Sequence, residues 1–163
     1  MKTLITGGKS AQALKLLKAF SADQVLLADY GEIPSYASAQ YQFVTLGERN
    51  EDTIAHNLLN ACLDQEADRL LPLYQFELEA LVKSAVLFEE FNIHILLPDL
   101  NDFPYYKLGG AIDKQNWVVY DKGVLVYASQ PETLEGIPAA NLNGAFYMNK
   151  EADTITPILF TIS

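Results

Sequence analysis

The chain of 163 residues is 50% hydrophobic and carries 11 basic against 21 acidic side chains, a formal net charge of −10. This length and composition predict one domain, or one domain with an extension, and exclude a disordered protein. The acidity disfavours nucleic acid and anionic membrane surfaces as partners, and no apolar run approaches the roughly 20 residues of a membrane-spanning helix.

The first predicted elements alternate strand and helix. Residues 3–6 are rich in β-branched side chains and stop at a pair of glycines, as a strand does. Ser10 is expected to cap the helix that follows. The apolar side of that helix is expected to comprise Leu14, Leu17 and Phe20. Residues 25–28, apolar throughout, predict a strand buried on both faces, and residues 42–45 predict another strand.

Two more helices and two more strands are predicted before Pro98. Asn50 is expected to cap a helix ending near Leu63, with two acidic residues in its first turn. Its apolar stripe is Ile54, Ala55, Leu58, Leu59, Cys62 and Leu63. Residues 70–73 and 93–97 predict strands. The helix between them has a stripe of Leu78, Leu81, Val82, Ala85 and Phe88, with Glu77, Glu79 and Lys83 on its solvated side.

The order of these elements is β-α-β-β-α-β-α-β. Near-continuous apolar strands in this order predict a mainly parallel sheet with helices on both faces. We therefore expect an α/β fold in which residues 1–103 form a Rossmann-like, three-layer core.

The pattern changes to hairpins after Pro104. Residues 117–120 and 124–127 flank a turn in which Gly123 can supply a positive φ, and residues 145–148 and 154–160 form a second pair. Pro157 cannot donate to a ladder, so its strand is expected at an edge or with a bulge. Residues 104–163 are therefore expected to form an antiparallel β-hairpin extension of the same domain, added to the sheet edge or folded over it.

Ligands of an open parallel sheet bind beyond the carboxyl ends of its strands, at the point where the strand order reverses. That rim is expected to comprise Gly7 to Ser10, Asp29-Tyr30, Tyr74 to Glu77, and Asp99. Two glycines let the backbone approach a ligand, and the start of a helix favours an anion such as phosphate or carboxylate. We therefore predict a small anionic ligand. The candidate binding residues are Gly7, Gly8, Lys9, Ser10, Asp29 and Glu77.

Other interpretations of the same loop stay open. Asp29 lies 21 residues after Gly8, near the offset at which a dinucleotide-binding fold places a carboxylate on a ribose. The loop does not contain G-x-G-x-x-G, so a small NAD(P)-binding oxidoreductase or nucleotide-sensing domain competes with a strand-to-helix turn that binds nothing. Gly8-Lys9-Ser10 also imitates the end of a P-loop, but Thr3 stands where the first glycine would be.

No catalytic or metal-binding set is readable in the sequence. His56 and His94 have no metal-ligand spacing, and Cys62 falls on an apolar stripe, which predicts a place in the core. A single cysteine excludes disulfide frameworks and fits a reducing compartment, so we expect a cytoplasmic protein.

Three segments resemble a known family. They are residues 3–8, Leu27-Ala28-Asp29 with Pro34 and the small-residue stretch 35–39, and residues 67–73 with 77–81 after them. These segments resemble the N-terminal, pre-ATP-grasp domain of ATP-grasp enzymes, in particular of carbamoyl-phosphate-synthase large-subunit-like ligases. The resemblance covers about residues 1–103. It implies a Rossmann-like domain that forms one wall of a site, while ATP and Mg²⁺ are held by the ATP-grasp domains that follow in that family.

The remaining residues depart from the family. Residues 104–163 lack the glycine-rich lid, the lysine and the carboxylate pair that bind nucleotide and metal there. The resemblance therefore implies a domain that is not catalytic by itself, with a separately encoded ATP-grasp subunit as a natural partner. Self-association through the C-terminal strands is a second expectation.

Overall fold

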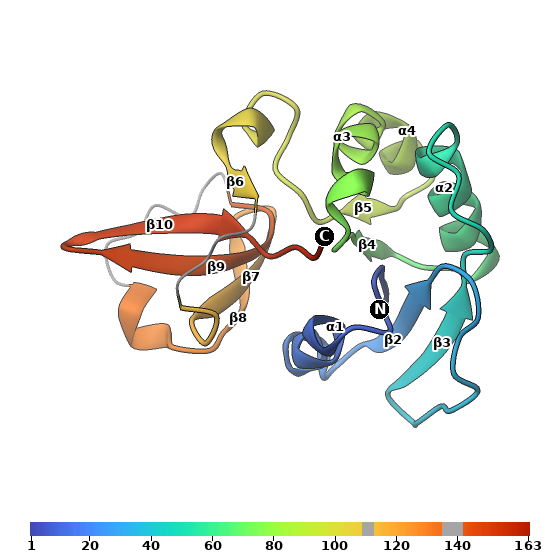
Figure 1. The fold of residues 1–163 in the computed structure, drawn as a ribbon, viewed down its shortest axis with the longest axis horizontal. Helices are drawn as coiled ribbons and strands as arrows, with labels where there is room; N and C mark the ends of the chain where they lie inside the picture. The colour runs from blue at the N-terminus through green and yellow to red at the C-terminus, as the bar shows by residue number, and fades with distance from the viewer. Residues whose placement is uncertain (109–112, 135–141) are drawn as a thin grey trace.

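The computed structural model describes residues 1–108, 113–134 and 142–163. A parallel sheet of five strands, sheet A, is followed by a second sheet of five strands, sheet B (Figure 1). The predicted α/β core with a C-terminal β extension is therefore confirmed.

Sheet A has the strand order β3-β2-β1-β4-β5, and all its strands run parallel. The strands are β1 (Lys2–Ile5), β2 (Gln24–Asp29), β3 (Tyr41–Thr45), β4 (Arg69–Leu71) and β5 (His94–Ile95). β1, β2 and β4 are almost wholly buried, as their apolar sequences predict. β2 and β3 lie on one side of β1, and β4 and β5 lie on the other. The strand order therefore reverses between β1 and β4, which makes their carboxyl ends the switch point.

Helices cover both faces of sheet A, so the predicted three-layer core is confirmed (Figure 1). α1 (Ala11–Leu16) and the 3₁₀ turn η1 (Leu17–Phe20) pack on one face. α2 (Ile54–Asp64), α3 (Gln75–Lys83) and α4 (Ala85–Glu90) pack on the other. None of the helices in the described ranges is long and apolar enough to cross a membrane.

The first helix begins where the sequence predicts, but its buried side chains differ from the predicted ones. The Ser10 hydroxyl oxygen accepts a hydrogen bond from the Ala13 N–H at 3.1 Å, so Ser10 is the N-cap. The helix tightens to 3₁₀ geometry at Leu17, and the buried side chains are Ala13, Leu16 and Phe20. Leu14, predicted on the apolar side, is 46% exposed.

The second helix begins later than predicted. The Asn50 side chain accepts from the Asp52 N–H at 3.0 Å, forming a local turn that competes with a helix start. The helix therefore begins at Ile54, and the two acidic residues precede it. Leu63 was also predicted on the buried stripe, but it lies about 100° around the helix from buried Cys62 and is 40% exposed.

The third predicted helix is divided into two helices, and Glu77 faces the core instead of solvent. Ser84 leaves helical geometry, with φ −106° and ψ 8°, and separates α3 from α4. Glu77, predicted on the solvated side, is fully buried. Glu77 is buried because α3 begins only four residues after β4 ends, so the first turn of α3 points at the carboxyl edge of sheet A.

Sheet B has the order β6-β10-β9-β7-β8 and is antiparallel except where β6 pairs with β10. Its strands are β6 (Lys107–Leu108), β7 (Trp117–Asp121), β8 (Val124–Ala128), β9 (Gly144–Glu151) and β10 (Thr154–Leu159). The 3₁₀ turns η2 (Phe103–Tyr105) and η3 (Pro131–Leu134) lie before and between these strands. The β7–β8 turn has Lys122 and Gly123 at φ 50° and 81°, as a tight hairpin turn requires.

β10 lies inside sheet B and pairs with β9 without a register shift, which differs from the prediction of an edge or bulged strand. β6 pairs only with Ile158 and Leu159 of β10. Pro157 comes just before this pairing, so its missing N–H removes no bond from the β6 ladder.

Sheet B packs against the outer edge of sheet A without joining its ladder. The Asn143 amide donates to the backbone oxygens of Ile95 and Leu97 at 3.3 and 2.8 Å. Gly144 allows close approach, because a Cβ there would lie 2.6 Å from the Leu96 backbone oxygen. These contacts cover the β5 edge. Each face of sheet B also continues one of the two hydrophobic cores of sheet A.

A buried arginine joins the two sheets. Arg69 on β4 is 8% exposed and pairs with Asp23, just before β2, and with Asp121, at the end of β7. Its Nε donates to the Thr3 hydroxyl at 3.2 Å, and its guanidinium lies 5.1 Å from the centre of the Phe20 ring. This single side chain therefore contacts three segments that are distant from β4 in sequence: β1, the stretch from Phe20 to Asp23, and the end of β7.

Candidate functional site

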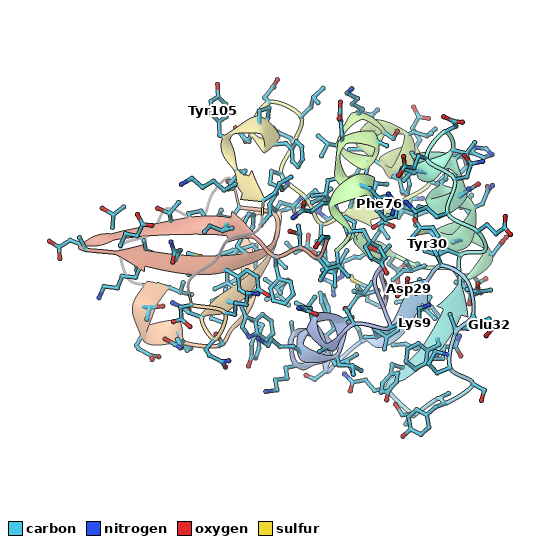
Figure 2. The ribbon with its side chains drawn as sticks, viewed as in Figure 1. Lys9, Asp29, Tyr30, Glu32, Phe76 and Tyr105 are labelled. Carbon is cyan, nitrogen blue, oxygen red and sulfur yellow. The ribbon has the colours of Figure 1, made fainter. Side chains whose placement is uncertain are left out.

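The predicted rim residues meet at the carboxyl edge of sheet A. The Gly7–Ser10 loop follows β1, Asp29 ends β2, and Glu77 lies in the first turn of α3 after β4. Figure 2 shows Lys9, Asp29, Tyr30 and Phe76 in one region beside the ends of β1 and β2. Asp99, the other predicted rim residue, lines a separate cavity beside α4 and β5.

The glycine loop lies directly against β2. Gly8 donates its N–H to the Ala28 backbone oxygen at 2.9 Å. A Cβ on Gly8 would lie 2.6 Å from the Leu27 carbonyl carbon and 2.8 Å from the Ala28 nitrogen. Glycine is therefore required here by the close approach of two backbone segments.

Gly8→Ala is expected to lower the free energy of unfolding by about 1–3 kcal/mol, because backbone atoms of a central strand must move to accept the methyl group. Urea unfolding followed by circular dichroism measures this difference. Gly47→Ala is the comparison variant: a Cβ there meets nothing within 4 Å, so it measures only the cost of a left-handed φ, which Gly8 does not have. If Gly8→Ala left stability unchanged, the close approach would be disproved.

Asp29 holds the glycine loop in place. It is 2% exposed, and its carboxylate accepts from the Lys9 N–H at 3.0 Å, from the Tyr30 N–H at 2.8 Å and from the Tyr74 hydroxyl at 2.7 Å. The carboxylate thus faces the loop where an anionic ligand was predicted. Asp29 links the ends of β1, β2 and β4.

Glu77 is the most deeply buried carboxyl group of the site. It accepts hydrogen bonds from the hydroxyls of Thr6 and Tyr30, the second at 2.7 Å. Burial raises the pKa of Glu77 from 4.5 to about 7, against the opposing effect of these hydrogen bonds. Glu77 therefore exchanges a proton near neutral pH, a property that concentrates at functional sites.

Two tyrosines bridge the carboxylates and remain neutral. Burial, with the nearby Glu77 charge, raises the pKa of Tyr30, and burial with the hydrogen bond to Asp29 raises the pKa of Tyr74. Their rings and that of Phe76 form a cluster, with centroid distances of 5.1 to 5.9 Å. Both hydroxyls act as donors that point into the site.

Two basic side chains border this aromatic cluster. Lys9 is exposed, and its ammonium donates to the backbone oxygens of Tyr30 and Glu32 at 3.0 and 3.1 Å. The Arg49 guanidinium lies 3.5 Å from the centre of the Phe76 ring. Its positive charge opposes the rise in the pKa of Tyr74, so it acts on that hydroxyl as well. Arg49 also pairs with Glu51, so the rim carries the Lys9 ammonium and a partly neutralised guanidinium above an acidic interior.

The last residues of the chain cover the switch point (Figure 1). The Ile162 N–H donates to the Leu73 oxygen at 2.8 Å, and the Gln75 N–H donates to the Ile162 oxygen at 3.0 Å. The Ile162 side chain lies so close to Gly7 that a Cβ there would meet it at 2.6 Å. The space between the ends of β1 and β4 is filled by protein, and the exposed rim residues Lys9 and Glu32 lie on the β2 side.

The sequence placed Tyr30 and Tyr74 on the rim but assigned them no role, and it did not indicate Thr6, Arg49 or Ile162. Tyrosine within three residues of the end of a parallel strand is a signal that could have been used. Arg49 and Ile162 reach the site from loops and the chain end, where no periodicity marks them. Cys62 is buried as predicted, and burial raises the pKa of its thiol to about 12.

Comparison with known protein families finds no model that matches the chain, and comparison with curated proteins finds no match either. Within the described ranges, no group of three or more His, Cys, Asp or Glu side chains is arranged to hold a metal ion.

Proposed function

We propose that the chain is a pre-ATP-grasp-type binding domain that recognises a small anionic ligand at the carboxyl edge of sheet A and is not catalytic by itself. One observation carries the proposal. Residues of the β1–α1 loop, the end of β2 and the start of α3 converge there, joined through the Lys9–Asp29 and Tyr30–Glu77 hydrogen bonds. In open parallel sheets this edge is the place where ligands bind.

The charges of the site favour a ligand with an anionic group and with hydroxyls. Lys9 and Arg49 border the rim and can hold a phosphate or carboxylate. Beside them, the Tyr30 and Tyr74 hydroxyls, which donate to Glu77 and Asp29, keep lone pairs that can accept hydrogen bonds from ligand hydroxyls. A nucleotide carries both kinds of group, in its phosphate and its ribose.

The internal hydrogen bonds of the carboxylates support a role in positioning. Asp29 accepts three donors from the protein and Glu77 accepts two hydroxyls. Groups engaged in this way shape a binding wall. A separate ATP-grasp subunit, which the family resemblance suggests, would then supply the chemistry.

The test is a thermal unfolding experiment on the full chain with ATP, AMP, NADH, NADPH or inorganic phosphate, each added separately. A ligand present at 100 times its Kd adds about 2.7 kcal/mol to the stability of the folded state. We expect ATP or AMP to stabilise the protein, and Lys9→Met to remove that stabilisation. Lys18→Met, at an exposed position on η1, is the matched control and should retain it.

Two results would contradict the proposal. Stabilisation by NADH or NADPH but not by ATP or AMP would favour a nicotinamide-nucleotide-binding domain. The absence of any shift with all five compounds would leave the glycine loop with a structural role alone. The unfolding midpoint of each variant without ligand is measured first, because Lys9→Met also removes two hydrogen bonds to backbone oxygens.

A further inference from the structure

A cavity lies between the two sheets. It measures about 260 Å³ and is bounded by α3 and α4, by the segment after β5 and by the β7–β8 turn. It shares no lining residue with the site at the carboxyl edge of sheet A. Its size is below the roughly 300–1,000 Å³ typical of pockets for drug-sized ligands, so it suits a smaller molecule.

One wall of the cavity is apolar. Leu81, Val82, Leu97 and Leu142 line it, and each is at least nine-tenths buried. These side chains belong to the core that sheet A and sheet B share. The wall therefore offers a hydrophobic surface that is held in place from both sides.

The rest of the cavity carries charges of both signs. Asp99 and Asp102 lie close together, since the Asp102 N–H donates to the Asp99 carboxylate at 2.9 Å. Lys122, in the β7–β8 turn, also lines the cavity. In the described part of the chain, neither the Asp102 carboxylate nor the Lys122 ammonium forms a hydrogen bond or ion pair. Glu89 and His94, by contrast, contact each other at 2.9 Å.

We propose that this cavity binds a small zwitterion with an apolar side chain, of the α-amino-acid class. The ligand ammonium would lie against Asp99 and Asp102, and its carboxylate against Lys122. Its side chain would cover the leucine and valine wall. Charge-assisted hydrogen bonds of this kind are stronger than neutral ones, and the buried wall adds hydrophobic free energy that a charged ligand without a side chain cannot gain.

The charges of Lys122 and Asp102 can each be removed without the loss of a side-chain hydrogen bond among the described residues. Lys122 has a positive φ, at a turn position that asparagine adopts more readily than lysine. Lys122→Asn therefore removes the charge while preserving the turn. Asp102 makes no capping hydrogen bond with its side chain, so Asp102→Asn should also fold normally.

The experiment is a calorimetric titration of the full chain with four probes. They are L-leucine, isocaproate, which lacks the amine, isopentylamine, which lacks the carboxylate, and glycine, which lacks the side chain. We expect leucine to bind, and each other probe to bind about tenfold more weakly or worse. Lys122→Asn should weaken leucine and isocaproate but not isopentylamine, and Asp102→Asn should weaken leucine and isopentylamine but not isocaproate. Lys150→Asn, on the exposed end of β9, is the control and should change nothing.

Several outcomes would overturn the proposal. These are no binding of leucine at millimolar concentration, equal binding of leucine and glycine, and equal binding of leucine and isopentylamine. Unchanged leucine affinity in both variants would overturn it as well. The urea midpoint of each variant, compared with that of the unmodified chain, confirms that any loss of binding occurs in folded protein.

Discussion

Replacing Arg69 by methionine is expected to lower the free energy of unfolding by about 3–5 kcal/mol. The methionine side chain can fill much of the same space, so the loss comes mainly from charge. Asp23 and Asp121 would keep their carboxylates at the junction of the two sheets without the cation that pairs with them. The Thr3 hydroxyl would also lose its donor. An uncompensated buried charge costs far more than an exposed ion pair contributes.

Urea unfolding of the full chain measures this effect. Arg69→Lys is expected to be intermediate, because one ammonium cannot reproduce the planar fork that contacts both carboxylates. Lys83→Met is the control: it breaks the Lys83–Glu79 pair, whose side chains are 60% and 77% exposed, and should leave the midpoint nearly unchanged. If Arg69→Met and Lys83→Met had the same effect, the junction would not depend on Arg69.

Stability is expected to fall by about 3 kcal/mol as the pH rises from 4.5 to above 7, because of Glu77. The pKa of this carboxyl is about 7 in the folded protein, against the ordinary 4.5 that applies in the unfolded chain. Below pH 4.5 both states hold the proton, and burial carries no charge penalty. Between these values the unfolded chain releases the proton while the folded protein retains it, so unfolding becomes easier. Above pH 7 the full penalty of a buried charge applies.

Glu77→Gln should remove most of this pH dependence. The amide has nearly the same shape and no charge, so the variant is expected to match the unmodified chain near pH 4.5 and to be the more stable protein at pH 8. Urea midpoints at several pH values between these limits test the claim. Glu90→Gln, at an exposed position on α4, is the control and should keep the original slope. If Glu77→Gln also kept the dependence of stability on pH, the titrating group would be a different residue.

Much of the fold was predictable because its signals are local. The apolar strands β1, β2 and β4 and the Ser10 cap can each be recognised within a few residues. The location of the candidate site was also predictable, since the residues that follow parallel strands must meet at one edge. The same rule places Lys9, Asp29 and Glu77 at one edge of the sheet.

The errors have a common cause. Periodicity placed Glu77 on the solvated side of a helix, yet the short connection after β4 turns the first turn of α3 inward. Asn50 matched a helix cap, but its side chain forms a turn of its own. Glu77 could lie on the solvated or the buried side of its helix, and Asn50 could cap a helix or form a local turn. Contacts with other parts of the chain, which the local pattern does not contain, decide between these alternatives.

Length, composition and hydrophobic pattern were therefore enough to establish the α/β core, the later hairpins and the edge of the sheet where a ligand is expected. The pairing of Arg69 with Asp23 and Asp121, the burial that moves the pKa of Glu77 towards neutrality, and the position of Ile162 over Gly7 depended on the tertiary structure. Each joins residues 46 to 155 positions apart, or results from the removal of water around a group. Such contacts are set by how sheet B packs on the edge of sheet A and how α3 follows β4, and no pattern of neighbouring residues encodes that packing.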